Sequence, residues 1–312
     1  MKKLSCSLLA IASLALGAAA GAAPAKPAAA PRPASATATA APGATATIPG
    51  ATQHVTVPLS DPARAGALHV NLIHGSIIVK GSNRKDVSIE VRPRARAGHD
   101  DDGDDDRDDD RDDHHDGKSP SAGLRQIAQP LAFTVEEENN RVEVSSNDPR
   151  RACDMIIEVP ARMDLDLSTI NNGRIEVDGV DGEHEISHVN GAILLSRIGG
   201  SVVAHTTNGE VRVTFTRVTP GKPMAFTTLN GAVDVSLPPT TRANLRLRSD
   251  QGQLFTDFDF TQQAVELKES KEPGGRTLRE IGKVIGGSIN GGGPEFELRS
   301  FNGNVYVRKA GS

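Results

Sequence analysis

A short motif, glycine followed by two apolar residues in alternation, recurs seven times in the 312-residue chain and restricts its fold more than any other feature. Asparagine usually precedes the glycine. The seven copies are His74–Val79, Asn172–Val177, Asn190–Leu195, Asn208–Val213, Asn230–Val235, Gln251–Thr256 and Asn302–Val307, of which only Gln251–Thr256 lacks the second apolar residue. Asn-Gly favours a tight turn, and alternation after it is typical of a strand with one buried face. Each copy therefore predicts a turn followed by a half-buried strand.

The spacing of the copies indicates stacked repeats. From Asn172 to Asn230 the asparagines advance by 18, 18 and 22 residues, with further turn signals such as Gly199-Gly200 between them. A unit of about 20 residues thus holds two strands and two turns. Isolated hairpins would make successive motif strands antiparallel, whereas a solenoid would stack them in parallel. Because equivalent strands keep the same inward parity, we predict an all-β fold, a β-solenoid-like stack of short strands with Asn-Gly turns.

The inward positions of the motif should form one continuous core, because they stand two apart within each strand and recur after each turn. These positions are Ile175, Val177, Ile193, Leu195, Val211, Val213, Val233, Val235, Val305 and Val307. The motif glycines are expected to be conformational rather than catalytic, since glycine adopts positive φ without strain. Most of them should therefore have positive φ.

The first 51 residues differ from the rest, with 20 alanines and no Asp or Glu. Residues 1–23 have the parts of a secretory signal peptide: Lys2 and Lys3, the apolar run Leu4–Leu16, and small residues for cleavage. Cys6 precedes most of the apolar run, so we do not expect a lipid anchor there. The sequence predicts an exported protein, in the periplasm or at the cell surface.

Residues 24–51 contain six prolines and few residues able to form a core, which is typical of a semi-extended linker. Residues 52–312 then make up the β-strand-repeat domain. Within it, residues 95–123 form an acidic insert, where the stretch His99–Asp116 carries 12 Asp against two Arg and has no apolar residue. Such a segment cannot offset the entropy of ordering, so we expect it to be disordered.

The acidic insert is also the only weak candidate for a metal site. Carboxylates suit Ca²⁺ and histidine adds a softer ligand, and the residues concerned are Asp112, His114, His115 and Asp116. Gly123 stands where a calcium loop would require its bidentate glutamate. We therefore expect weak, diffuse Ca²⁺ binding and no cofactor.

Paired carboxylates raise the alternative of an enzyme acting on polysaccharides. Asp164 and Asp166 share one side of a strand, as do Asp257 and Asp259, and two carboxylates can cleave a glycosidic bond. Leu165 occupies the buried parity, however, which leaves its neighbours on the solvent face. The chain has one Tyr and no Trp, so it offers few aromatic platforms for sugars. We predict that it is not an enzyme and has no catalytic residue.

Three histidines and one cysteine complete the set of candidate functional groups. His184 and His188 lie four apart beside two glutamates, and His205 follows. On a strand the first two would be about 13 Å apart, too far to share one ion, so we interpret all three as solvated surface residues. Cys153 directly precedes an apolar run without an activating motif and is expected to be buried and inert.

The opening stretch Val70–Gly81, the repeated Asn-Gly strands and the closing stretch Ile285–Val305 resemble the bacterial putative-adhesin family, whose exported β-strand-repeat domain has no known function. The resemblance covers roughly residues 55–308 without the acidic insert. It implies a β-solenoid on the envelope side of the membrane and no established site residue.

Together these features predict a non-enzymatic, exported scaffold or binding domain of the bacterial cell envelope, adhesin-like, with an unknown ligand. Its partner would be an envelope component or a protein. Nucleic acid is not expected, because basic residues alternate with acidic ones and lack aromatic stacking partners. No apolar run outside the signal peptide is long enough to span a membrane. The alternatives are a polysaccharide-acting β-helix enzyme, a lyase or hydrolase, and a Ca²⁺-responsive envelope-stress module that uses the acidic insert.

Overall fold

The computed structural model describes residues 52–94, 131–146, 151–171, 173–263, 270–271, 277–278 and 284–311, which lie in one compact unit, Ala46–Ser312. Every regular element in these residues is a strand, and none of them forms a helix that could span a membrane. The predicted signal peptide (residues 1–23), the linker (24–51) and the acidic insert (95–123) with its candidate ligands lie outside the described residues.

The strands are β1 (Gln53–Pro58), β2 (Gly66–His74), β3 (Ile77–Ser82), β4 (Asp86–Pro93), β5 (Phe133–Glu138), β6 (Arg141–Ser146), β7 (Cys153–Pro160), β8 (Met163–Asn171), β9 (Ile175–Asp178), β10 (Asp181–Asn190), β11 (Ile193–Asn208), β12 (Val211–Val218), β13 (Met224–Asn230), β14 (Val233–Leu237), β15 (Ala243–Ser249), β16 (Leu254–Thr256), β17 (Phe260–Gln263), β18 (Ser270–Lys271), β19 (Thr277–Leu278), β20 (Val284–Ile289), β21 (Glu295–Asn302) and β22 (Val305–Lys309).

Two faces of stacked strands enclose the core. The long-strand face runs β5-β6-β2-β8-β10-β11-β13-β21-β15-β20-β17, and the short-strand face runs β1-β4-β7-β3-β9-β11-β12-β14-β22-β16. Strand β11 pairs through its first half with β9 and β12 and through its second half with β10 and β13, so it joins the faces. Neighbouring strands are parallel from β6 to β15 and from β7 to β16, and antiparallel pairs close both ends. The predicted β-solenoid fold is confirmed.

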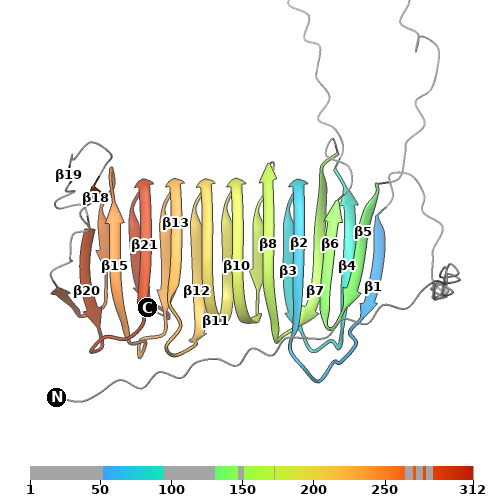
Figure 1. Ribbon diagram of the computed structural model, residues 1–312, viewed down its shortest axis with the longest axis horizontal. Coiled ribbons are helices and arrows are strands. Elements are labelled where there is room, and N and C mark those ends of the chain that lie inside the picture. The colour runs from blue at the N-terminus through green and yellow to red at the C-terminus, as the bar shows by residue number, and fades with distance from the viewer. Residues whose placement is uncertain are drawn as a thin grey trace, which may run out of the picture. The chain divides into compact units, whose positions relative to one another are not determined.

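The order of the coils in space is not their order in the chain. The coil β2–β3 lies between β6–β7 and β8–β9, and the coil β21–β22 lies between β13–β14 and β15–β16. In Figure 1 the blue β2 stands beside the green β8, and the red β21 stands between the orange β13 and β15. One coil from early in the chain and one from late in the chain are thus inserted as inner coils, and both make pairings over long sequence distances.

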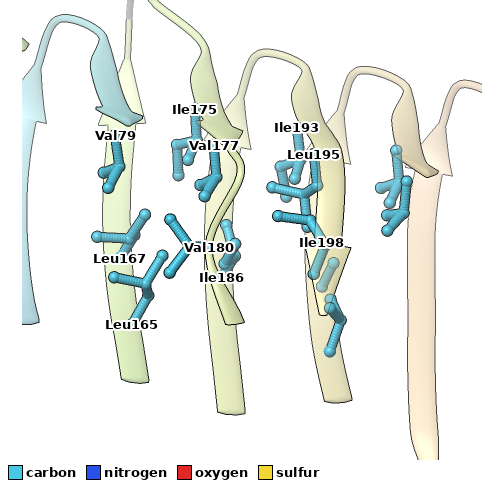
Figure 2. Close-up of a cluster of buried hydrophobic side chains, with 14 of the residues drawn as sticks. Val79, Leu165, Leu167, Ile175, Val177, Val180, Ile186, Ile193, Leu195 and Ile198 are labelled. Carbon is cyan, nitrogen blue, oxygen red and sulfur yellow. The ribbon is translucent and has the colours of Figure 1, made fainter. Parts of the chain in front are cut away.

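The motif's alternation fills the space between the faces. All ten predicted core residues are buried. Figure 2 shows the repetition: Ile175 and Val177 of one coil are followed by Ile193 and Leu195 of the next, with Leu165 of the long-strand face nearby. Stacking places like residues on like, so the core is one continuous cluster. Its burial is the main stabilising contribution, because apolar area leaves water along the whole stack.

Two polar ladders run beside the motif turns. Asparagine side chains form one, in which the Nδ2 of Asn302, Asn230, Asn208 and Asn190 each donates over 2.7 Å to the Oδ1 of the next, ending at Asn171. The motif predicts Asn172, the next residue, as the turn asparagine of that coil. The strand register, which pairs His74 with Asn171, instead brings this earlier asparagine into the ladder.

The second ladder is buried and lies two residues before the asparagines. The hydroxyls of Thr206, Thr228 and Ser300 donate to the carbonyl oxygens of Gly191, Gly209 and Gly231 over 2.8–2.9 Å. Each bond links one coil to the turn of its neighbour. Buried backbone carbonyls at the turns are thereby satisfied, as a dry interior requires.

The motif glycines are needed chiefly because the coils approach closely. A Cβ on Gly303 would lie 1.9 Å from the carbonyl oxygen of Gly231, and one on Gly231 would lie 2.1 Å from that of Gly209. Positive φ occurs at Gly75, Gly209 and Gly231, but Gly191 and the last two motif glycines lie outside the left-handed region. The prediction that most of these glycines have positive φ is therefore wrong. Close contact between the turns of neighbouring coils is the more general reason why glycine is required at these positions.

We predict that Gly303→Ala destabilises the fold by about 3 kcal/mol or more, because the methyl group has to displace backbone rather than a side chain. Gly221→Ala is the control, since Gly221 has φ +78° and no atom within 4 Å of the added Cβ, so only the left-handed strain of about 1–2 kcal/mol applies. Urea unfolding of both variants measures the difference. An equal or smaller loss at Gly303 would contradict the close-approach argument.

Candidate functional site

A groove of about 530 Å³ opens on the outer surface of the long-strand face, and we take it as the candidate site. Outward side chains of β2, β8, β10 and β11 line it, together with Arg141 of β6 and with Lys222 and Pro223 of the loop between β12 and β13. Its volume lies in the range that is usual for ligand sites.

Four carboxylates stand side by side on the floor of this groove. They belong to two neighbouring parallel strands, Asp164 and Asp166 to β8, and Glu183 and Glu185 to β10. The register pairs Asp166 with Glu185, and the backbone N–H of Glu183 donates to Asp164 Oδ1 over 2.8 Å. Each acidic residue therefore has an acidic neighbour across the strands, which destabilises a sheet.

Charges of opposite sign meet across some neighbouring strands of the solenoid. Arg308 Nε lies 3.0 Å from Asp234 Oδ1 across β22 and β14, and Arg94 Nη2 lies 2.6 Å from Asp154 Oδ1. Like charges are also paired outside the groove, as at Glu136 and Glu143 of β5 and β6. The acidic pairing on β8 and β10 differs in lining a groove, where a concave surface focuses the negative potential.

Two of the four carboxylates have a basic side chain as partner. His69 Nδ1 lies 2.8 Å from Asp166 Oδ2, and Lys222 Nζ lies 2.7 Å from Glu183 Oε1. Within the described part of the chain, Asp164 and Glu185 form no ion pair. The groove therefore presents two uncompensated carboxylates between a histidine and a lysine.

The structure brings together residues that the sequence presented separately. Asp164 and Asp166 point outward, as their alternation with Leu165 indicated, but Glu183 and Glu185 were considered only as neighbours of histidines. A signal was available, since each aspartate precedes its stacked glutamate by the same interval of 19 residues that separates Asn171 from Asn190. The second aspartate pair has a different role, because the carboxylate of Asp257 accepts the backbone N–H of Lys309 at the far end of the stack.

The interpretation of the histidines as surface residues is wrong for two of the three. His205 is exposed, but His184 is only 4% exposed and His188 is fully buried. Strand parity explains this: because Glu183 and Glu185 point outward, the residues that alternate with them face the core. Burial lowers the pKa of both histidines.

His188 replaces a hydroxyl residue in the buried ladder. Its Nε2 contacts the carbonyl oxygen of Gly173 over 3.1 Å, as the threonines do in the neighbouring coils, while Nδ1 has no partner. Neither ring nitrogen of His184 has a hydrogen-bond partner. Both imidazoles are thus kept neutral inside the fold.

Cys153 is buried, and burial raises the pKa of its thiol to about 11. Its thiolate, the nucleophilic form, is therefore suppressed at neutral pH. Among the described residues no group of three His, Cys, Asp or Glu side chains could hold a metal ion. The weak metal candidates Asp112, His114, His115 and Asp116 lie outside these residues, so the Ca²⁺ hypothesis stays a prediction.

Residues 163–281 match the family model of the Toastrack domain DUF4097, which bears out the resemblance drawn from the sequence. The chain matches no curated protein by sequence. Among solved structures it is similar to the crystal structure of a "putative cell adhesion protein" from Clostridium sporogenes, at 9% identity and a TM-score of 0.41, over 83% of this chain and 100% of that chain. The family match includes β8 and β10, which carry the four carboxylates.

Buried neutral histidines make the fold sensitive to acid. Because their pKa values are lowered in the folded state, the unfolded chain binds protons more readily, and stability falls as pH drops below about 6.5, the ordinary histidine value. Each such histidine contributes up to about 1.4 kcal/mol per pH unit. We predict that His188→Thr, which restores the hydroxyl ladder, reduces this acid sensitivity.

The measurement is the free energy of unfolding in urea between pH 7.5 and about 4.5. His205→Gln, a change at an exposed position, is the control and should leave the pH dependence as in the wild type. Identical slopes for His188→Thr and the wild type would show that His188 is not a source of the effect.

Proposed function

We propose that this protein is an exported, non-enzymatic binding scaffold of the bacterial cell envelope, and that the groove on its long-strand face holds a positively charged ligand. The observation that carries the proposal is the stacking of acid on acid across β8 and β10, with Asp164 and Glu185 uncompensated by any described cation. A bound ammonium or guanidinium group would offset the repulsion that these carboxylates impose on the empty fold.

A binding role agrees with the construction of the groove. Its floor consists of strands that are paired in register on both sides. The side chains of the groove are therefore held in place before a ligand binds. The two walls carry the cations Arg141 and Lys222, which leave the acidic centre open between them. A ligand with one or two positive charges fits this distribution better than an anion, because electrostatic complementarity selects the partner and speeds its approach.

The groove offers little support for chemistry. His69 is held by Asp166, and among the described residues no hydroxyl or thiol is hydrogen-bonded to it. No aromatic side chain lines the groove, and Tyr306, the single tyrosine, lies on the short-strand face. Both features favour binding over cleavage of a sugar chain.

We predict that the isosteric variant Asp164→Asn/Glu185→Gln binds a fluorescently labelled hexalysine peptide about tenfold more weakly than the wild type, or worse, and unfolds at a higher temperature. Asn can still accept the N–H of Glu183, so the local backbone should be preserved. Binding should weaken with added salt, because the attraction is electrostatic.

Glu176→Gln is the matched control, since Glu176 is a carboxylate on β9, in the same coil but on the other face. It should leave hexalysine binding unchanged. Failure of hexalysine to bind the wild type, or equal loss in the control, would remove the case for the groove.

The assignment to the envelope rests on residues 1–23. We predict that protein isolated from the envelope fraction of its bacterial host begins near residue 24, because the signal peptide is removed on export. N-terminal sequencing of the mature chain checks this. Recovery of chain with Met1 in the cytosol alone would contradict export.

A further inference from the structure

A row of exposed apolar side chains runs across the same face as the groove. Ile170 of β8, Val189 of β10, Leu229 of β13 and Phe301 of β21 are 41%, 37%, 45% and 39% exposed, and Thr207 of β11 fills the remaining place. Each directly precedes an asparagine of the ladder, so the register stacks them on five neighbouring strands. We call these five residues, four apolar side chains and one threonine, the apolar row. Exposed apolar side chains that stand in a row rather than singly indicate an interaction site.

The surroundings of the apolar row are uncharged over most of its length. On one side lies the asparagine ladder, and on the other the outward residues Ser168, Ser187 and Thr227 of β8, β10 and β13. The residues that flank the apolar row on β8, β10 and β13 are therefore polar but uncharged, so a partner can cover the row there without desolvating a charge.

The apolar row and the acidic floor keep a constant separation. Asp166 and Ile170 are four residues apart on β8, as are Glu185 and Val189 on β10, which corresponds to about 13 Å along a strand. The acidic floor and the apolar row each continue from one strand to the next, so both run at right angles to the strand direction. A partner that uses both must therefore lie along the stack and offer a cationic flank and an apolar flank.

We propose that the long-strand face binds an amphipathic α-helix, apolar along one flank and basic along the other, which lies across β8, β10, β11, β13 and β21. This inference rests on the proposed function, because the helix would place its basic residues in the groove. A helix with side chains is about 10–12 Å wide, which matches the separation of the two features. Its turns repeat every 5.4 Å, close to the spacing of about 4.8 Å between strands.

The dimensions set the length and polarity of the helix. Five strands span about 19 Å, which a helix of about 13 residues covers. The carboxylates lie at the β8 and β10 end, whereas Arg299 lies at the β21 end. The basic residues of the helix should therefore be concentrated in the half that covers β8 and β10.

Other partners fit less well. An extended peptide along one strand would meet one acidic and one apolar position and leave the neighbouring coils uncovered. An anionic bilayer would be repelled by the four carboxylates. A basic amphipathic helix satisfies both features at once, as in other helix-in-groove complexes.

The test uses a synthetic peptide of about 14 residues, with leucines on one face and lysines on one flank of its first half, and a scrambled peptide of the same composition. We expect the designed peptide to bind at least about tenfold more tightly than the scrambled one and to gain helical circular dichroism on binding. Two variants of the full chain separate the contributions: Val189→Ser/Leu229→Ser for the apolar row and Asp164→Asn/Glu185→Gln for the groove. Each should weaken binding about tenfold or more.

Leu194→Ser on the short-strand face is the control for the apolar row and should bind as the wild type does. If the designed and scrambled peptides bind equally, or if Val189→Ser/Leu229→Ser has no effect while hexalysine still binds, the helix inference is wrong and the proposed function stands. If hexalysine fails to bind, the proposed function is wrong. Binding without a gain of helix, or row-dependent binding to anionic vesicles, would also overturn the inference.

Discussion

Close, in-register contact between the turns of neighbouring coils is the constraint on which the rest of the structure depends. The backbone of one turn lies against the next at Gly209, Gly231 and Gly303, where a Cβ would come within about 2 Å of a carbonyl oxygen. Asparagine amides and buried hydroxyls then bond from coil to coil at the same turns. Once the turns are aligned, every other residue of a coil has a defined neighbour in the next.

This alignment has opposite effects on the two sides of each strand. Inside, it stacks apolar side chains such as Ile193 and Val211 into a continuous core. Outside, it stacks charges without regard to sign, so Asp166 meets Glu185. The same register that stabilises the core therefore creates the acidic groove and the apolar row, and a ligand could offset the cost of both.

The fold was largely predictable because its determinants are local. Alternation after each Asn-Gly turn identified the inward residues, and even the solvent position of Asp164 followed from parity. The histidines show where a spacing argument fails: the separation of His184 and His188 along a strand excludes a shared ion but does not place them at the surface, and the glutamates beside them already indicated inward parity. The groove was missed because its acidic residues come from two strands that are neighbours only after stacking.

By itself, the sequence determined that the chain forms short strands, where they turn and which side chains face inward, since these depend on residues close together in the chain. Only the tertiary structure decided the order of the coils, in which β2–β3 and β21–β22 are inserted between strands distant in sequence. That order depends on pairing between strands far apart in the sequence. Because the strands of the motif copies have nearly the same residue pattern, the local sequence does not specify which of them pair. The outward surface follows from the order, so the groove, unlike the core, acquires its full lining, which includes residues of β2 and β6, only in the tertiary structure.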